Sequence, residues 1–408
     1  MRKVVFNGVQ RALLSLLSQN LFLATDDGGK AMESMDFAEV FAEARAQAVP
    51  LLAFSRCNEL RLSEEQLAEI KGKLMTHTGK NLACFKAHAA LHSLLSDAGI
   101  DYCILKGAAS ARYYPDPLIR CMGDVDFYVR PDDVKKTEEL LVSAGFVRQD
   151  AEHHYHVGFK SREVSIEMHF DPIAPDNEAV RDTFRGYWSD LIDRSQLVDD
   201  GFGKYRVPSD FHHGFIMLCH VENHLIAEGI GLRHLCDWAV FANSFSNGEF
   251  IDTFEADLRR VGLWRLAQLL SLAAVEHLGM PYREWMGDDV QTANELLFDI
   301  FDGGNFGRKI SHRAYDGFFI SSYGKDGMDD SRLRQVTRAI NRRIADRFPS
   351  VKKFPVLYPF GWVWFFSRQA FLFIFGKRRL NVAKTYTRSG RRKKLYKKIR
   401  LLEPEVKD

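Results

Sequence analysis

Apolar residues recur at steps of three and four along both ends of this 408-residue chain. Residues 1–98 show this helical spacing in KNLACFKAHAALHSLLSDA, and Gly99 follows where a helix would end. Helical spacing returns after about residue 208, where Ser209 and Asp210 supply N-cap chemistry. The pattern therefore predicts helices on both sides of a differently built middle.

The middle of the chain alternates short strand-like runs with short helical ones. DYCIL, 101–105, and the alternating DVDFYV, 124–129, are typical of strands, and a small helical run, 107–114, separates them. A second helix, 134–145, precedes three further apolar runs that end at residue 171. The order β-α-β-α-β-β-β predicts a small α/β domain with a mixed sheet.

These patterns divide the chain into four predicted parts. They are an N-terminal helical segment, an α/β domain, a helical domain and an aromatic and basic C-terminal segment: 1–98, 99–208, 209–350 and 351–408. The six cysteines show no CxxC spacing, and polar side chains interrupt the leucine-rich start. We therefore expect reduced cysteines, no signal peptide and a cytoplasmic location.

Candidate chemistry lies in the α/β part. Asp124 and Asp126 stand two residues apart on a predicted strand, so their carboxylates share one face about 6.6 Å apart. Like charges so placed repel each other, and a divalent cation reverses that penalty. Glu167, between Ile166 and Met168, would add a third carboxylate from a neighbouring strand. The pattern predicts a site for Mg²⁺, with Mn²⁺ as an alternative, in which Glu167 is also the nearest base.

Upstream residues suit phosphate. Gly107 stands where a strand enters a helix, and a glycine there lets the backbone approach an anion. Lys106 and Arg120 flank the acidic face and could neutralise triphosphate charge. Arg120 could instead cap the loop after PDP, and Lys106 could instead form a salt bridge to an acid of the site. Ser110 is the nearest hydroxyl to this turn.

At these residues the sequence resembles a known family. LKGAA, YYPDPLIRCMGDVDFYV and IEMHF are similar to segments of the uncharacterised nucleotidyltransferase family of bacteria, within the polymerase-β-like superfamily. The resemblance implies that the site positions are Lys106, Gly107, Arg120, Gly123, Asp124, Asp126 and Glu167. One departure is Ala108, which stands where the superfamily often has serine after the turn glycine.

The resulting hypothesis is Mg²⁺-dependent transfer of a nucleoside monophosphate, from ATP or another nucleoside triphosphate, to a hydroxyl, with pyrophosphate leaving. The acceptor could be a small molecule, a sugar or a protein, and specific nucleic-acid binding is not expected. Two alternatives remain: a nucleotide-binding regulatory module without turnover, and a glycosyltransferase that uses DxD to hold a nucleotide-sugar. The helical character of residues 1–98 counts against the second, since such enzymes generally place a Rossmann-like half before DxD.

Several other polar residues have structural explanations. His220 and His224 lie one helical turn apart without the HExxH pattern, and core or surface positions explain them better. The run 153–156, HHYH, is expected on a strand facing the cleft or solvent. Arg233 and Asp237, at i and i+4, predict a helix-surface pair. The family resemblance also makes them candidates for contacts to the α/β domain. The glycine-rich run 301–311 lacks GxGxxG spacing and predicts a turn.

The C-terminal segment is both aromatic and basic. Residues 377–400 hold twelve Lys or Arg and no acid, directly after the aromatic run 354–375. Such a combination is typical of an element at the surface of an anionic membrane, so peripheral contact through 354–400 is one expectation. A packed aromatic helix that ends in a solvated basic tail is the other, and we favour it slightly.

Overall fold

A five-stranded mixed sheet lies at the centre of the computed structural model, which describes residues 4–23, 35–149, 156–172, 178–310 and parts of 313–405. The strand order is β1-β2-β5-β4-β3. The strand bounds are β1 Tyr102–Ile104, β2 Val125–Val129, β3 Val147–Arg148, β4 His156–Lys160 and β5 Ser165–His169. β2 and β5 are parallel, and the other pairs are antiparallel. The predicted mixed α/β architecture is therefore confirmed.

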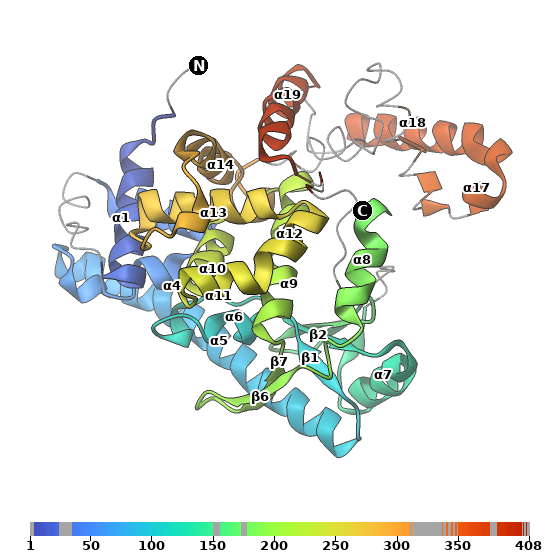
Figure 1. Cartoon of the computed structure of the whole chain (residues 1–408), viewed down its shortest axis with the longest axis horizontal. Coiled ribbons are helices and arrows are strands. Elements are labelled where there is room, and N and C mark those ends of the chain that lie inside the picture. The colour runs from blue at the N-terminus through green and yellow to red at the C-terminus, as the bar shows by residue number, and fades with distance from the viewer. Residues whose placement is uncertain are drawn as a thin grey trace.

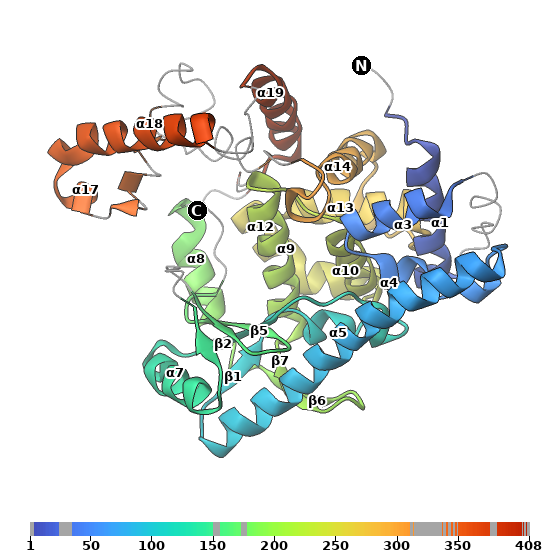
Figure 2. The same cartoon turned by 180° about the vertical axis from the view of Figure 1, so that it is seen from behind.

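Helix α5, Glu64–Asp97, is the long support beneath this sheet (Figure 2). Ser63 and Gln66 form a capping box at its start, and Gly99 adopts a left-handed conformation just beyond its end. Its apolar side chains Phe85, Leu91 and Leu95 share a core with the strands and with α7, Val134–Ser143. The β6–β7 hairpin, Gln196–Asp199 and Lys204–Val207, joins the same core.

The remaining helices build a second, larger core above the sheet (Figure 1). Those before the sheet are α1 Gly8–Phe22, α3 Phe37–Ala46 and α4 Pro50–Ala53. Those after it are α8 Glu178–Trp188, α9 Asp210–Ile226, α10 Leu232–Asn243, α11 Asn247–Phe250, α12 Ala256–Val261, α13 Trp264–Leu278 and α14 Val290–Gly303. Because α1 packs on α13, the first helical segment and the helices after 209 bury one common apolar core.

The C-terminal segment differs from the expectation of a packed aromatic helix and a solvated tail. Helices α17, Ser350–Lys353, and α18, Tyr358–Phe375, project to one side of the body (Figures 1 and 2). The basic helix α19, Val382–Ile399, instead packs on α13 and α14. Its Tyr396 is buried in the main core together with Leu395 and Ile399, because these three apolar residues lie on one face of the helix.

Candidate active site

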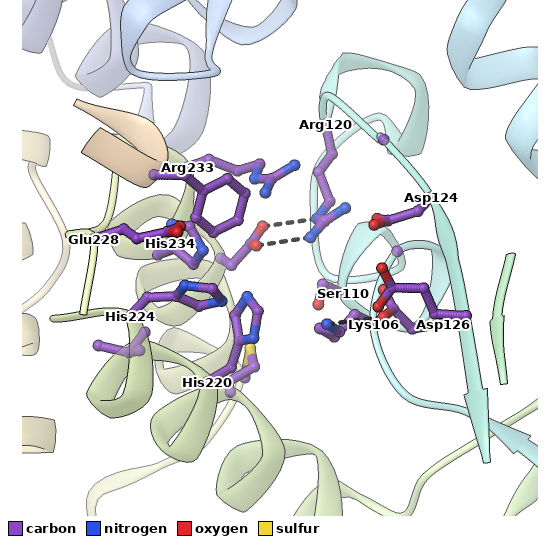
Figure 3. Close-up of a pocket in the computed structure, with 17 residues that line it drawn as sticks. Lys106, Ser110, Arg120, Asp124, Asp126, His220, His224, Glu228, Arg233 and His234 are labelled. Atoms are coloured by element: carbon purple, nitrogen blue, oxygen red, sulfur yellow. Dashed lines mark hydrogen bonds and ion pairs between the residues drawn. The ribbon is translucent and has the colours of Figure 1, made fainter. Parts of the chain in front are cut away.

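A pocket lies between the sheet and helices α9 and α10 (Figure 3). The sheet wall carries the predicted carboxylates and the Lys106–Gly107 turn, and the helical wall carries side chains that the sequence did not assign to a site. All eight predicted site residues line this one pocket: Lys106, Gly107, Ser110, Arg120, Gly123, Asp124, Asp126 and Glu167. The structure thus brings together residues that are 61 positions apart in the sequence, from Lys106 to Glu167.

The carboxylates meet because β2 and β5 are parallel neighbours with Asp126 opposite Glu167. Asp124 lies just before β2, and one oxygen from each of the three carboxylates lies within 4.8 Å of the others. Repulsion from Asp126, together with burial, raises the pKa of Asp124 to about 6. The sheet wall therefore concentrates negative charge at one point.

Asp126 is buried and already has two polar neighbours. Lys106 Nζ lies 2.9 Å from its Oδ1, and His169 Nε2 lies 3.2 Å from the same oxygen. Burial opposes its ionisation, but these two groups outweigh burial and hold the pKa of Asp126 well below its usual range. The His169 imidazole, with Nε2 3.7 Å from Glu167, likewise lowers the pKa of Glu167. Both carboxylates are therefore ionised at neutral pH.

The turn at Gly107 has the positive φ, +66°, that favours glycine. A Cβ there would lie 3.3 Å from His88 Nε2, so the buried His88 imidazole supports the turn from beneath. The helix that follows, α6 Ala108–Ala111, has only four residues. Ser110 is buried, and its hydroxyl lies 3.3 Å from His213 Nε2. The helical run predicted over 107–114 is therefore shorter in the structure, since α6 ends at Ala111 and residues 112–114 form a turn and a bend before Pro115.

Arg120 connects the two walls. Its Nε and one terminal nitrogen each donate a 2.8 Å hydrogen bond to Asp237, and the Tyr114 hydroxyl also donates to that carboxylate. The predicted helix-surface pair between Arg233 and Asp237 is therefore not the pair that forms. The alternative prediction, contact with the α/β domain, is confirmed, since Arg233 donates to the Cys121 carbonyl oxygen at 3.3 Å.

Three histidines form much of the helical wall. His220 and His224 come from α9, His234 comes from α10, and the ring of Phe306 packs against all three. Burial lowers the pKa of His224 to about 3 and the pKa values of the other two well below 6.5. These imidazoles are therefore neutral at neutral pH. The run 301–311 does contain the predicted turn, which additionally brings Phe306 to the pocket.

His156 begins strand β4, so the expected strand is confirmed for the part of the HHYH run that the structure describes, whereas 153–155 lie outside the described residues. It is buried on β4, with Nε2 3.9 Å from Glu167. His156, Glu167 and His169 form a second group with metal-ligand spacing. This group shares Glu167 with the aspartate group.

The donor set fits a divalent cation. Oxygen donors from Asp124, Asp126 and Glu167 converge, and hard cations such as Mg²⁺ prefer such oxygens. The pocket lining also holds five carboxylates against three cationic side chains, so a bound cation would relieve the repulsion that raises the Asp124 pKa.

Among the described residues, no helix is long and apolar enough to cross a membrane.

Comparison with known proteins identifies the family of the chain. A family model described as uncharacterised nucleotidyltransferase matches residues 33–279, which is more than half of the chain. The chain belongs to that family. A solved structure, an antigenic nucleotidyltransferase-like protein from Paracoccidioides brasiliensis, is similar at 18% identity and covers 49% of this chain and 94% of its own. Its TM-score to this chain is 0.33. No curated protein matches the chain.

Proposed function

We propose that this protein transfers a nucleoside monophosphate from a nucleoside triphosphate to a hydroxyl acceptor, with a divalent cation bound by Asp124, Asp126 and Glu167. The observation that carries the proposal is the convergence of these three carboxylates within 4.8 Å at the pocket. Mg²⁺ in such a site would neutralise and orient the phosphate oxygens. Membership of a nucleotidyltransferase family supports the same reaction class.

The protein's own groups suit this reaction. Asp126 stays ionised because Lys106 and His169 hold it, so it is a permanent anionic ligand. Glu167 is partly exposed and also ionised, and in this proposal it accepts the proton of the attacking hydroxyl. Gly107 lines the pocket and adopts the positive φ of the turn, so a phosphate oxygen could approach its backbone there. Positioning and electrostatics would supply most of the acceleration.

Incubation with each α-labelled nucleoside triphosphate and a cell lysate tests the proposal. The parent should transfer label to an acceptor only with Mg²⁺ or Mn²⁺, and Asp126→Asn should reduce transfer by about a thousandfold or more, since it removes a central ligand charge. Asp132→Asn is the matched control, because Asp132 is exposed and outside the pocket. Equal labelling by the parent and Asp126→Asn would show that the carboxylates do not carry the reaction.

A nucleotide-binding module without turnover is the second candidate. The contact between Lys106 and Asp126 at 2.9 Å favours it, because the ammonium neutralises a carboxylate that the reaction needs for a cation. Calorimetry separates the two functions. Heat of triphosphate binding without pyrophosphate release would support the module, whereas release of pyrophosphate that depends on acceptor supports the enzyme.

A further inference from the structure

Three cationic side chains line the pocket, and their partners differ. Lys106 pairs with Asp126, and Arg120 pairs with Asp237. Arg233, by contrast, forms no ion pair with any carboxylate among the described residues. Its recorded contacts are a 3.3 Å hydrogen bond to the Cys121 carbonyl oxygen and the face of the Phe306 ring, 5.8 Å away. Lys106 and Arg120, the two cations predicted to bind triphosphate, therefore each pair with a carboxylate. Arg233, which forms no such pair, was not predicted to bind phosphate.

A buried guanidinium that forms no ion pair is costly in this position. The Nε of Arg233 is buried and has no hydrogen-bond partner among the described residues. Burial and the neighbouring Arg120 lower the pKa of Arg233, and the nearby Asp237 and Asp124 offset them only in part, so the site disfavours its charge. Arginine nevertheless stays protonated in proteins. The free-energy cost is relieved when an anion with several acceptor oxygens enters the pocket, and guanidinium geometry matches phosphate well.

The position of Arg233 fits the far end of a triphosphate. Figure 3 shows its guanidinium reaching from the helical wall toward Arg120 and Asp124, across the pocket from the carboxylates. His220 and His224 beside it are neutral, so they add no repulsion to a second cation and can donate hydrogen bonds. A polyphosphate that contacts the carboxylate site at one end therefore meets a cation at the other.

We propose that Arg233 binds the terminal phosphates of the nucleoside triphosphate and stabilises the departing pyrophosphate, an inference that rests on the proposed function. In the reaction the acceptor oxygen forms a bond to the α-phosphorus as its proton passes to Glu167. The bond from the α-phosphorus to the bridging oxygen breaks, and pyrophosphate leaves with the electron pair. Arg233 contacts the group on which that negative charge develops.

Binding of nucleoside tri-, di- and monophosphates, measured by calorimetry with Mg²⁺, tests the inference. Arg233→Gln should raise the Kd of the triphosphate about tenfold or more and that of the monophosphate less than about twofold, because the lost contact is charge-assisted. Arg233→Lys should lie between them, since it keeps the charge without the paired donors. Arg56→Gln is the matched control, because Arg56 forms an exposed pair with Glu59.

The outcomes separate the two proposals. Triphosphate binding by Arg233→Gln as tight as that of the parent would overturn the role of Arg233 alone, and so would an equal loss for all three nucleotides. Failure of the parent to bind any of the four triphosphates would overturn the proposed function and this inference with it. Thermal unfolding of each variant shows whether folding is retained, and Arg233→Lys serves if Arg233→Gln does not fold.

A second, independent observation concerns the projecting helices. The projecting segment runs from η7, Pro355–Leu357, through α18. One side of it packs into a small apolar cluster, in which Phe365 of α18 lies with Ile344 and Val351. Six large apolar residues of this segment are each more than half exposed to solvent: Phe354, Val356, Phe360, Val363, Phe366 and Phe371. We call these six residues the α18 surface. Several large apolar side chains exposed along one short segment are typical of an interaction site.

Charge identifies the partner. Residues 347–402 contain sixteen Lys or Arg and no Asp or Glu. Arg347, Lys353 and Arg368, within or beside the α18 surface, are exposed. A second copy of this chain would bring like charges together, whereas an anionic lipid surface accepts both the apolar side chains and the cations. We propose that the α18 surface docks on an anionic membrane without crossing it.

Flotation of the full chain with vesicles tests this docking. Vesicles containing about a third of phosphatidylglycerol should carry the protein, vesicles of phosphatidylcholine alone should carry about tenfold less, and added salt should weaken binding. Phe360→Ser with Val363→Ser should reduce binding about tenfold, because buried apolar area is lost. Val147→Ser, at another exposed apolar side chain, should not.

Equal flotation with both vesicle types, or unchanged flotation of the double variant, would overturn the membrane proposal. So would a dimer in solution that the same double substitution dissociates, since the α18 surface would then be an interface between two copies. Neither result bears on nucleotide binding at the pocket, which lies away from this surface.

Discussion

The two walls of the pocket respond to burial in opposite ways. On the sheet wall, Asp126 and Glu167 stay charged because Lys106 and His169 lie beside them. On the helical wall, burial holds the histidines neutral, and His224 has a pKa of about 3. A buried group therefore keeps its charge only where a partner is present. Arg233 is the exception on the helical wall, since it is a buried cation that forms no ion pair, and this is why we propose that it binds phosphate.

Breaking the link between the walls should have the largest effect on stability. Arg120 and Asp237 are both buried, so Arg120→Ala leaves a carboxylate with Tyr114 as its remaining recorded side-chain partner. We expect a loss of roughly 3–5 kcal/mol in the free energy of unfolding. Denaturant titration of Arg120→Ala, Asp237→Ala and the double variant measures it. If the two single losses simply add, the pair does not couple the walls.

This link also shows the limit of prediction from sequence. The carboxylate site could be predicted, because alternation along a strand is local and the Asp126–Glu167 register follows from two such strands. The Arg120–Asp237 pair joins residues 117 positions apart, and the i,i+4 spacing of Arg233 and Asp237 suggested a different pair. Helical periodicity predicts which face is buried, but it does not show which cation reaches a given acid.

The sequence also contains a signal for the β6–β7 hairpin, which the apolar pattern alone did not predict. The β6–β7 hairpin surrounds DDGFG, 199–203, a turn sequence between two apolar runs, and Gly201 adopts a positive φ. The burial of α19 could not be predicted from its composition. Its Leu395, Tyr396 and Ile399 lie on one helical face, and the many cations around them hide that face in any average. The histidine wall likewise needs the packing of α9 against α10.

Acid should weaken the helical wall through its histidines. Burial is the largest cause of the low pKa of His224. Lys106 and Arg233 lower this pKa further, whereas Asp126 and Glu167 raise it. In the unfolded chain His224 takes up a proton below about pH 6.5, but in the folded protein it does so only near pH 3. Its contribution to stability is thus complete above pH 6.5 and decreases as pH falls. Between pH 6.5 and 5 it should cost about 2 kcal/mol.

Chemical denaturation across that pH range measures the effect. His224→Gln, which has no titrating ring, should lose about 2 kcal/mol less than the parent between pH 6.5 and 5. His92→Gln is a useful comparison, because His92 is a half-buried histidine of α5 that lies outside the pocket. An identical pH slope for the parent and His224→Gln would mean that the imidazole is not held neutral by the fold.

The smallest expected effect concerns the turn of the sheet wall. Gly107→Ala forces a residue with a side chain into a positive φ and brings its Cβ to 3.3 Å from His88 Nε2, so we expect a loss of about 1–2 kcal/mol in stability. Gly123→Ala is the matched control, since a Cβ there meets no atom within 4 Å and its φ is not in the left-handed region. Thermal unfolding of both variants gives the difference. A Gly107→Ala variant as stable as Gly123→Ala would show that the turn relaxes freely and that His88 does not fix the backbone beside Asp124.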